Sequence, residues 1–71
     1  MREYSEMDRR IKKVFGDRVT IEWVEPLHDE DFEPGYAYCV RQGGFNVIYG
    51  SDKMSFEKNV LVLAAALAKE A

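Results

Sequence analysis

Residues 36–49 read YAYCVRQGGFNVIY, two runs of alternating apolar residues on either side of a glycine pair. Alternation with a period of two is typical of a half-buried strand, and adjacent glycines can take the positive φ that a tight hairpin turn needs. The stretch therefore predicts a β-hairpin that turns within residues 42–44. Either choice of turn places the same large side chains on one face, namely Tyr38, Val40, Phe45, Val47 and Tyr49.

Regular elements are also predicted on both sides of this hairpin. Residues 19–24 alternate in the same way, which predicts an earlier strand. Apolar residues at helical spacing predict a helix before that strand, ending at Gly16, and another helix near the end of the chain. The first set is Tyr4, Met7, Ile11, Val14 and Phe15, and the second is Phe56, Val60, Leu63 and Leu67. Ser51 and Asp52 are predicted to cap the start of the last helix.

These elements predict an α+β fold in the order helix, three-stranded antiparallel meander, helix (αβββα), as one domain over residues 1–71. Two layers would bury the apolar stripes, with both helices on one face of the sheet. The aromatic residues are expected on that face, buried against the helices instead of serving as a stacking platform for nucleic-acid bases. They are Trp23, Tyr36, Tyr38, Phe45 and Tyr49. We expect Trp23 to lie in the core.

The composition is that of a globular protein without a cofactor. Of the 71 residues, 46% are apolar and 32% are charged. The single cysteine, Cys39, excludes an internal disulfide, and Cys39 and His28 together fall short of a structural zinc site, so no metal is expected. The longest apolar run is well short of the roughly 20 residues of a membrane span, and no signal peptide is recognisable. We therefore expect a cytoplasmic protein without a membrane partner.

Catalysis is not expected. His28 precedes Asp29, an arrangement in which a carboxylate could orient a histidine base, but the chain offers no convincing nucleophile for that base. Cys39 falls on a predicted strand, on the sheet face away from the helices, with Arg41 as its only cationic neighbour. A chain of this size also has difficulty in building a pocket that excludes water. The sequence therefore favours a binding protein over an enzyme.

Charge is strongly segregated along the chain. Residues 1–18 sum to +2, residues 22–33 to −6 and the remainder to +1, which gives the net charge of −3. The acidic stretch contains no Lys or Arg and joins the first two predicted strands. Clustered carboxylates attract and orient basic surfaces, and two prolines restrict this loop. The predicted contact residues are Glu25, Asp29, Glu30, Asp31 and Glu33.

Our leading hypothesis is a small regulator or inhibitor whose acidic loop engages a basic protein partner. That partner could be a nucleic-acid-binding protein, with the acidic loop imitating the phosphates of its nucleic acid. In size, charge and class the chain resembles small acidic proteins of phages and mobile elements, including some anti-CRISPR proteins. A merely solvated loop is an alternative. Calcium is a weaker one, because the alternation of Asp29, Asp31 and Glu33 continues with Pro34 and Val40 where an EF-hand loop has glycine and glutamate.

Nucleic acid is the second candidate partner. The element order, the spacing Pro26-x-His28-x-x-x-Phe32 and the alanine-rich last helix resemble the double-stranded-RNA-binding domain. That resemblance implies RNA binding through the basic first helix, although Ser51-Asp52-Lys53 stands where the family has a lysine pair. The candidate phosphate contacts are Arg9, Arg10, Lys12 and Lys13. Acidic residues four positions earlier partly neutralise this cluster.

A third candidate function is a structural homodimer. The last predicted helix carries small and apolar residues on the side opposite its core stripe, where a solvated helix would be polar. They are Leu61, Val62, Ala65 and Ala68. Small residues permit close approach, so this helix-packing surface predicts contact with a second copy or another partner.

Overall fold

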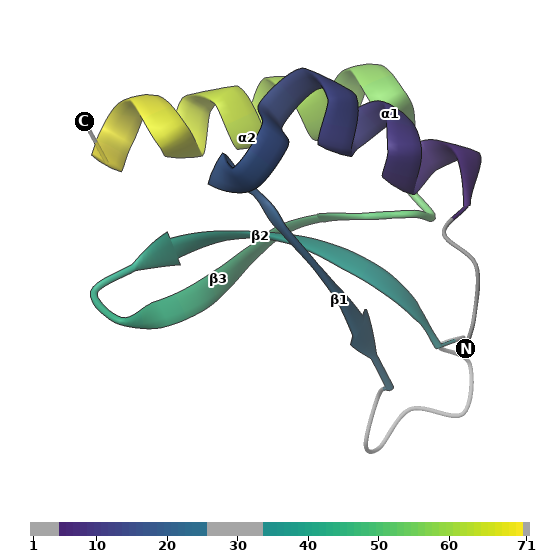
Figure 1. Ribbon diagram of the computed structural model, residues 1–71, viewed down its shortest axis with the longest axis horizontal. Coiled ribbons are helices and arrows are strands. Elements are labelled where there is room, and N and C mark those ends of the chain that lie inside the picture. The colour runs from purple at the N-terminus through teal and green to yellow at the C-terminus, as the bar shows by residue number, and fades with distance from the viewer. Residues whose placement is uncertain (1–4, 26–33, 71) are drawn as a thin grey trace.

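The computed structural model describes residues 5–25 and 34–70 (Figure 1). The elements are the helix α1 (Glu6–Phe15), a 3-10 turn η1 (Gly16–Arg18), the strands β1 (Thr20–Val24), β2 (Gly35–Gln42) and β3 (Phe45–Ser51), and the helix α2 (Phe56–Glu70). The predicted αβββα order and α+β class are therefore confirmed.

The sheet is a three-stranded antiparallel meander in the order β1-β2-β3. Gln42 pairs with Phe45 across a two-residue turn in which Gly43 and Gly44 have φ of 56° and 88°. This conformation strains any residue with a Cβ, which explains the glycine pair. The register between β2 and β3 shifts beside Tyr38, so that Tyr49 is an extra residue in β3. The hairpin and its turn thus form as predicted.

Both helices lie on the same face of the sheet, with α2 over β2 and β3 (Figure 1). Helical spacing turns Ile11 and Phe15 of α1, and Leu63 and Ala66 of α2, toward the sheet. The buried apolar core is formed by Ile11, Phe15, Val19, Tyr36, Tyr38, Val40, Leu63 and Ala66. The central strand β2 contributes the largest buried side chain, Tyr38, and is covered by neighbours on both edges.

The two helices are capped by serines. Ser5 accepts a hydrogen bond from the Asp8 amide at 3.2 Å, and the Asp8 carboxylate accepts one from the Ser5 amide at 3.1 Å. In α2 the Ser55 hydroxyl accepts from the Lys58 amide at 3.2 Å. The predicted cap at Ser51 and Asp52 is wrong, because β3 continues to Ser51 and pairs there with β2.

Asp8 is a buried carboxylate that joins α1 to the central strand. It is 1% exposed, and its other oxygen accepts a hydrogen bond from the hydroxyl of Tyr38. Burial first, and then the hydrogen bond and negative charge of Asp8, raise the pKa of Tyr38 well above its ordinary value. Tyr38 therefore remains a donor at all physiological pH values. A buried charge costs free energy unless it is hydrogen-bonded, so this contact determines where α1 can lie.

Asn59 joins α2 to β3 in a similar way. Its side-chain amide donates to the carbonyl of Ser51 at 2.9 Å and accepts from the Ser51 amide at 3.1 Å, as a neighbouring strand would. Asn59 is fully buried. A Cβ on Gly50 would lie 2.1 Å from the Asn59 oxygen, so only glycine fits at that position.

Two aromatic residues are not buried as predicted. Trp23 is 44% exposed and Phe45 is 76% exposed. The face assignment is not the cause of the error, because Trp23 contacts Tyr36 edge-on with ring centroids 5.2 Å apart. Trp23 is exposed because neither α1 nor α2 covers β1: this strand packs chiefly against β2, and α1 packs against α2 instead of over β1. Phe45 follows the hairpin turn directly, where the sheet ends.

Tyr38→Phe should destabilise the fold by about 1–3 kcal/mol, because it leaves a buried carboxylate with one fewer donor. Urea unfolding measures this loss. Tyr49→Phe is the matched control, since it removes a hydroxyl that accepts a hydrogen bond from Gln42, at 2.7 Å, in a partly exposed position. Equal stability of the two variants would contradict the role given to the contact between Asp8 and Tyr38.

Candidate functional site

Most of the predicted acidic surface lies outside the described residues. Asp29, Glu30, Asp31 and Glu33 belong to the segment 26–33, as does His28, so their role stays a prediction. Of the predicted contact residues, the structure describes Glu25, which is exposed directly after β1.

Glu22, the first residue of the acidic stretch, is engaged within the sheet. It accepts a hydrogen bond from the side chain of Asn46 at 2.5 Å and approaches the Cys39 sulfur at 3.9 Å. Glu22 and Asn46 come from the two outer strands and meet on the sheet face away from the helices. Glu22 is therefore not available as a freely presented charge.

The four basic residues of α1 are all exposed, but two of them make local contacts. The Arg10 guanidinium lies 3.8 Å from the centre of the Phe56 ring of α2. The Lys12 ammonium lies 3.6 Å from an Asp17 oxygen and donates to the Val19 carbonyl at 3.4 Å. The side chains of Arg9 and Lys13 make no hydrogen bond or ion pair with the described residues. The basic cluster is therefore divided.

The predicted helix-packing surface is solvent-facing. Leu61 is 71% exposed, Ala65 and Ala68 are exposed, and Val62 is partly buried. Contact of this surface with a partner stays a prediction.

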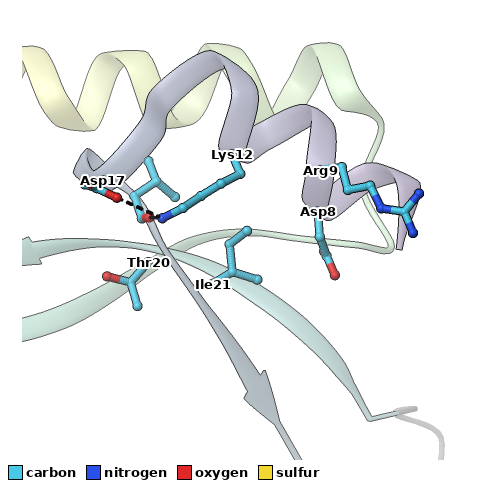
Figure 2. A pocket seen from close by; sticks show the side chains of 7 residues that line it. Asp8, Arg9, Lys12, Asp17, Thr20 and Ile21 are labelled. Carbon is cyan, nitrogen blue, oxygen red and sulfur yellow. Dashed lines mark hydrogen bonds and ion pairs between the residues drawn. The ribbon is translucent and has the colours of Figure 1, made fainter. Parts of the chain in front are cut away.

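A groove of about 380 Å³ lies between α1 and β1, and no pattern in the sequence predicts it (Figure 2). From α1 and its 3-10 turn it is lined by Asp8, Arg9, Lys12 and Asp17, and from the start of β1 by Val19, Thr20 and Ile21. Figure 2 shows Lys12 reaching from α1 toward the start of β1. The groove exists because α1 packs against α2 and stands away from β1.

One wall of this groove is the edge of β1 that faces away from β2. In the described part of the sheet this edge has no neighbouring strand. The carbonyl of Tyr36 accepts from the amide of Asp52, on the β3 side of β2. Backbone groups alternate in direction along a strand, so the residues opposite Ala37 and Gly35 carry the hydrogen bonds between β1 and β2. The backbone amide and carbonyl of Ile21 consequently point outward, toward the groove.

The Val19 carbonyl supports the same assignment. It accepts a hydrogen bond from Lys12, so it faces α1 and not β2. Val19 is two residues before Ile21 and has an extended backbone, with φ −119° and ψ 132°. Backbone groups two residues apart in an extended chain point the same way. Lys12 thus covers the first outward carbonyl of the edge, and the next outward residue is Ile21.

Cys39 lies on the sheet face away from the helices, as predicted, but it is completely buried. Burial, and secondarily the charge and hydrogen-bond acceptance of Glu22, raise the pKa of the Cys39 thiol from 9.0 to about 11. A thiolate is the reactive form of cysteine, so this thiol is a poor nucleophile at neutral pH.

A smaller hollow of about 100 Å³ lies beside Val24, Ile48 and Lys53. One oxygen of the neighbouring Asp52 carboxylate is buried and has no hydrogen-bond partner among residues 5–25 and 34–70. The hollow is too small for a chain segment.

Among the described residues no group of three or more His, Cys, Asp or Glu side chains could hold a metal ion, and no described helix is long and apolar enough to cross a membrane.

The raised pKa of Cys39 makes stability fall at alkaline pH. Between about pH 9 and 11 the thiol ionises first in the unfolded chain, which favours unfolding as the pH rises. Cys39→Ala should therefore lose less stability over this range than the unchanged chain, as measured by urea unfolding at several pH values. Tyr38 contributes equally to both proteins, so parallel pH profiles would contradict the assignment to Cys39.

No protein-family model, no curated protein and no solved structure matches the chain. The geometry of the described residues is therefore the basis on which a function is proposed.

Proposed function

We propose that the chain is a non-enzymatic protein-binding module that receives an extended segment of a partner protein along the outer edge of β1. The observation that carries this proposal is the outward-facing backbone of Ile21 beside a groove of about 380 Å³. An extended peptide can add a strand to such an edge, where main-chain hydrogen bonds supply affinity and side-chain pockets supply specificity.

The groove suits an extended chain better than a compact ligand. One wall is a strand edge and the other is a helix, so a peptide between them pairs with β1 while its side chains alternate between two environments. Side chains turned toward the helices meet Ile21 and Val19. Side chains turned the other way lie next to Thr20, which is exposed. We therefore expect a partner segment with apolar residues at every second position.

The charges around the groove favour a carboxylate in the partner. Arg9 lines the groove and makes no ion pair with the described residues. Lys12 pairs with Asp17, but both side chains are so exposed that the pair is weak and easily exchanged. Beyond β1 the exposed Glu25 is available to a basic residue of the same partner. A basic partner is also what the acidic stretch predicts.

Such a module acts by binding and blocking a segment of its partner, as a regulator or inhibitor does. While a segment of the partner is paired with β1, that segment cannot bind the other molecules with which the partner interacts. We propose no chemical step, and the neutral, buried thiol of Cys39 agrees with this view.

RNA binding through α1 is the second candidate, favoured by the exposure of its four basic residues. The two proposals differ in what they require of Lys13, which is exposed but does not line the groove. Phosphate binding would use Lys13 as much as Arg9, whereas peptide binding in the groove would use Arg9 and not Lys13.

Panning a displayed library of random linear peptides against the purified protein tests the proposal. Enriched peptides should show alternating apolar residues with at least one acidic residue, and bind with Kd on the order of micromolar. Arg9→Glu should weaken binding at least about tenfold, because it replaces an attraction with a repulsion. Lys13→Glu is the matched control and should leave Kd nearly unchanged.

A backbone substitution separates strand addition from simple contact. Ile21→Pro removes an amide that β1 does not use in pairing with β2, and edge strands tolerate proline. We expect it to abolish peptide binding while Ile21→Val retains it, with circular dichroism showing that both variants fold. Enrichment of no peptide, or binding that Lys13→Glu and Arg9→Glu weaken equally, would overturn the proposal.

A further inference from the structure

The second edge of the sheet differs from the first. Strand β3 has the sequence FNVIYGS and contains no charged residue or proline. Natural edge strands are usually protected against pairing by lysine, proline or a covering element. Two large apolar residues of β3 are conspicuously exposed, Phe45 and Ile48, the latter at 56%. This edge is thus open to pairing over its first half, before the irregularity at Tyr49.

The outward backbone groups of β3 can be assigned from its turn. In a hairpin with a two-residue turn, the two residues that flank the turn are hydrogen-bonded to each other. In this hairpin they are Gln42 and Phe45. Alternation then directs the backbone of Val47 toward β2 and the backbones of Asn46 and Ile48 outward. Two outward residues flank one inward residue, an arrangement that is symmetric about Val47.

We propose that β3 pairs with β3 of a second copy of this chain, antiparallel and with a two-fold axis through Val47. In that register Asn46 of each copy lies opposite Ile48 of the other, and these pairs exchange backbone hydrogen bonds. Val47 then lies opposite itself as a non-hydrogen-bonded pair. The axis is perpendicular to the sheet, so the two three-stranded sheets form one continuous sheet with all helices on the same face.

The absence of charge is what selects a second copy as the occupant. A two-fold contact brings each surface against itself, so any charged residue near the axis would face a like charge. Strand β3 itself contains no charged residue, whereas the groove beside β1 is lined by Arg9, Lys12 and Asp17. A partner of opposite charge would find no complementary group on β3.

The flank of α2 above β3 extends the proposed interface. Phe56 contacts Arg10 of α1, so helical spacing turns the opposite flank of α2, with Val62 and Ala65, toward the side of β3. Two members of the predicted helix-packing surface therefore join this interface.

Crosslinking at the two-fold axis tests the register directly. Val47→Cys should form an intermolecular disulfide, because a non-hydrogen-bonded antiparallel pair holds its Cα atoms about 4.5 Å apart, within disulfide range. Leu61→Cys, equally uncharged and more exposed, is the control. Under the same mild oxidation Val47→Cys should crosslink at least about tenfold faster, because association raises the effective thiol concentration. Equal rates would overturn the proposal.

The oligomeric state of the protein in solution provides a second test of the proposal. Sedimentation equilibrium should give a mass that roughly doubles with rising concentration for the unchanged chain. Val47→Lys should remain monomeric, and Val14→Lys, the same change on the exposed side of α1, should still dimerise. A mixture of Val47→Lys and Val47→Glu should restore the dimer. A monomer at every concentration up to about 1 mM, or a dimer insensitive to Val47→Lys, would contradict the inference. Neither result depends on peptide binding at β1.

Discussion

The hydrogen bond from Tyr38 to the buried carboxylate of Asp8 is the constraint on which the arrangement of α1 depends. A carboxylate can be buried at this depth only where hydrogen-bond donors are in place. Within the described part of the chain, those donors are the hydroxyl of Tyr38 in the central strand and the amide of Ser5. Because Asp8 belongs to the first turn of α1, its position anchors the start of that helix above β2. The helix then packs against α2, and β1 is left with an open edge.

The two edges of this small sheet differ in their charge and in the elements that lie beside them. Beside β1, the displaced helix creates a groove with charged walls, which suits an extended segment of a different protein. Beside β3, the edge is uncharged and symmetric in its backbone pattern, which suits a second copy. Pairing at β3 would leave both β1 edges free at the outer ends of a continuous sheet. The two inferences are thus compatible, and each can fail without the other.

Much of the fold was predictable from the sequence because local signals agree with one another. The glycine pair determines the hairpin, and the 3.6-residue and two-residue periods determine the helices and strands. The exposure of Trp23 could not be predicted, since parity identifies the face of the sheet on which a side chain lies but not whether a helix covers that face. The α2 cap was also missed, because Ser51 and Ser55 are equally good candidates until the length of β3 is known.

The groove was the least predictable feature. Asp8 in the sequence resembles an ordinary acidic residue in the first turn of a helix, and only the reach of Tyr38 from 30 residues away shows that it faces inward. The one available signal is that the first strand of a meander must be an edge. The proposed contact residues at positions 26–33 carry a charge signal that composition reveals without any structure, and their geometry lies outside the described residues.

The most direct test of the account is the measurement of nuclear Overhauser contacts between the Ile21 amide and a peptide bound to the isotope-labelled protein. Strand addition at β1 requires cross-strand contacts from the Ile21 amide to the peptide backbone, together with slowed hydrogen exchange of that amide. We expect both. A bound peptide whose contacts lie on the Arg10 and Lys13 side of α1, with the Ile21 amide exchanging as fast as in the free protein, would contradict the account.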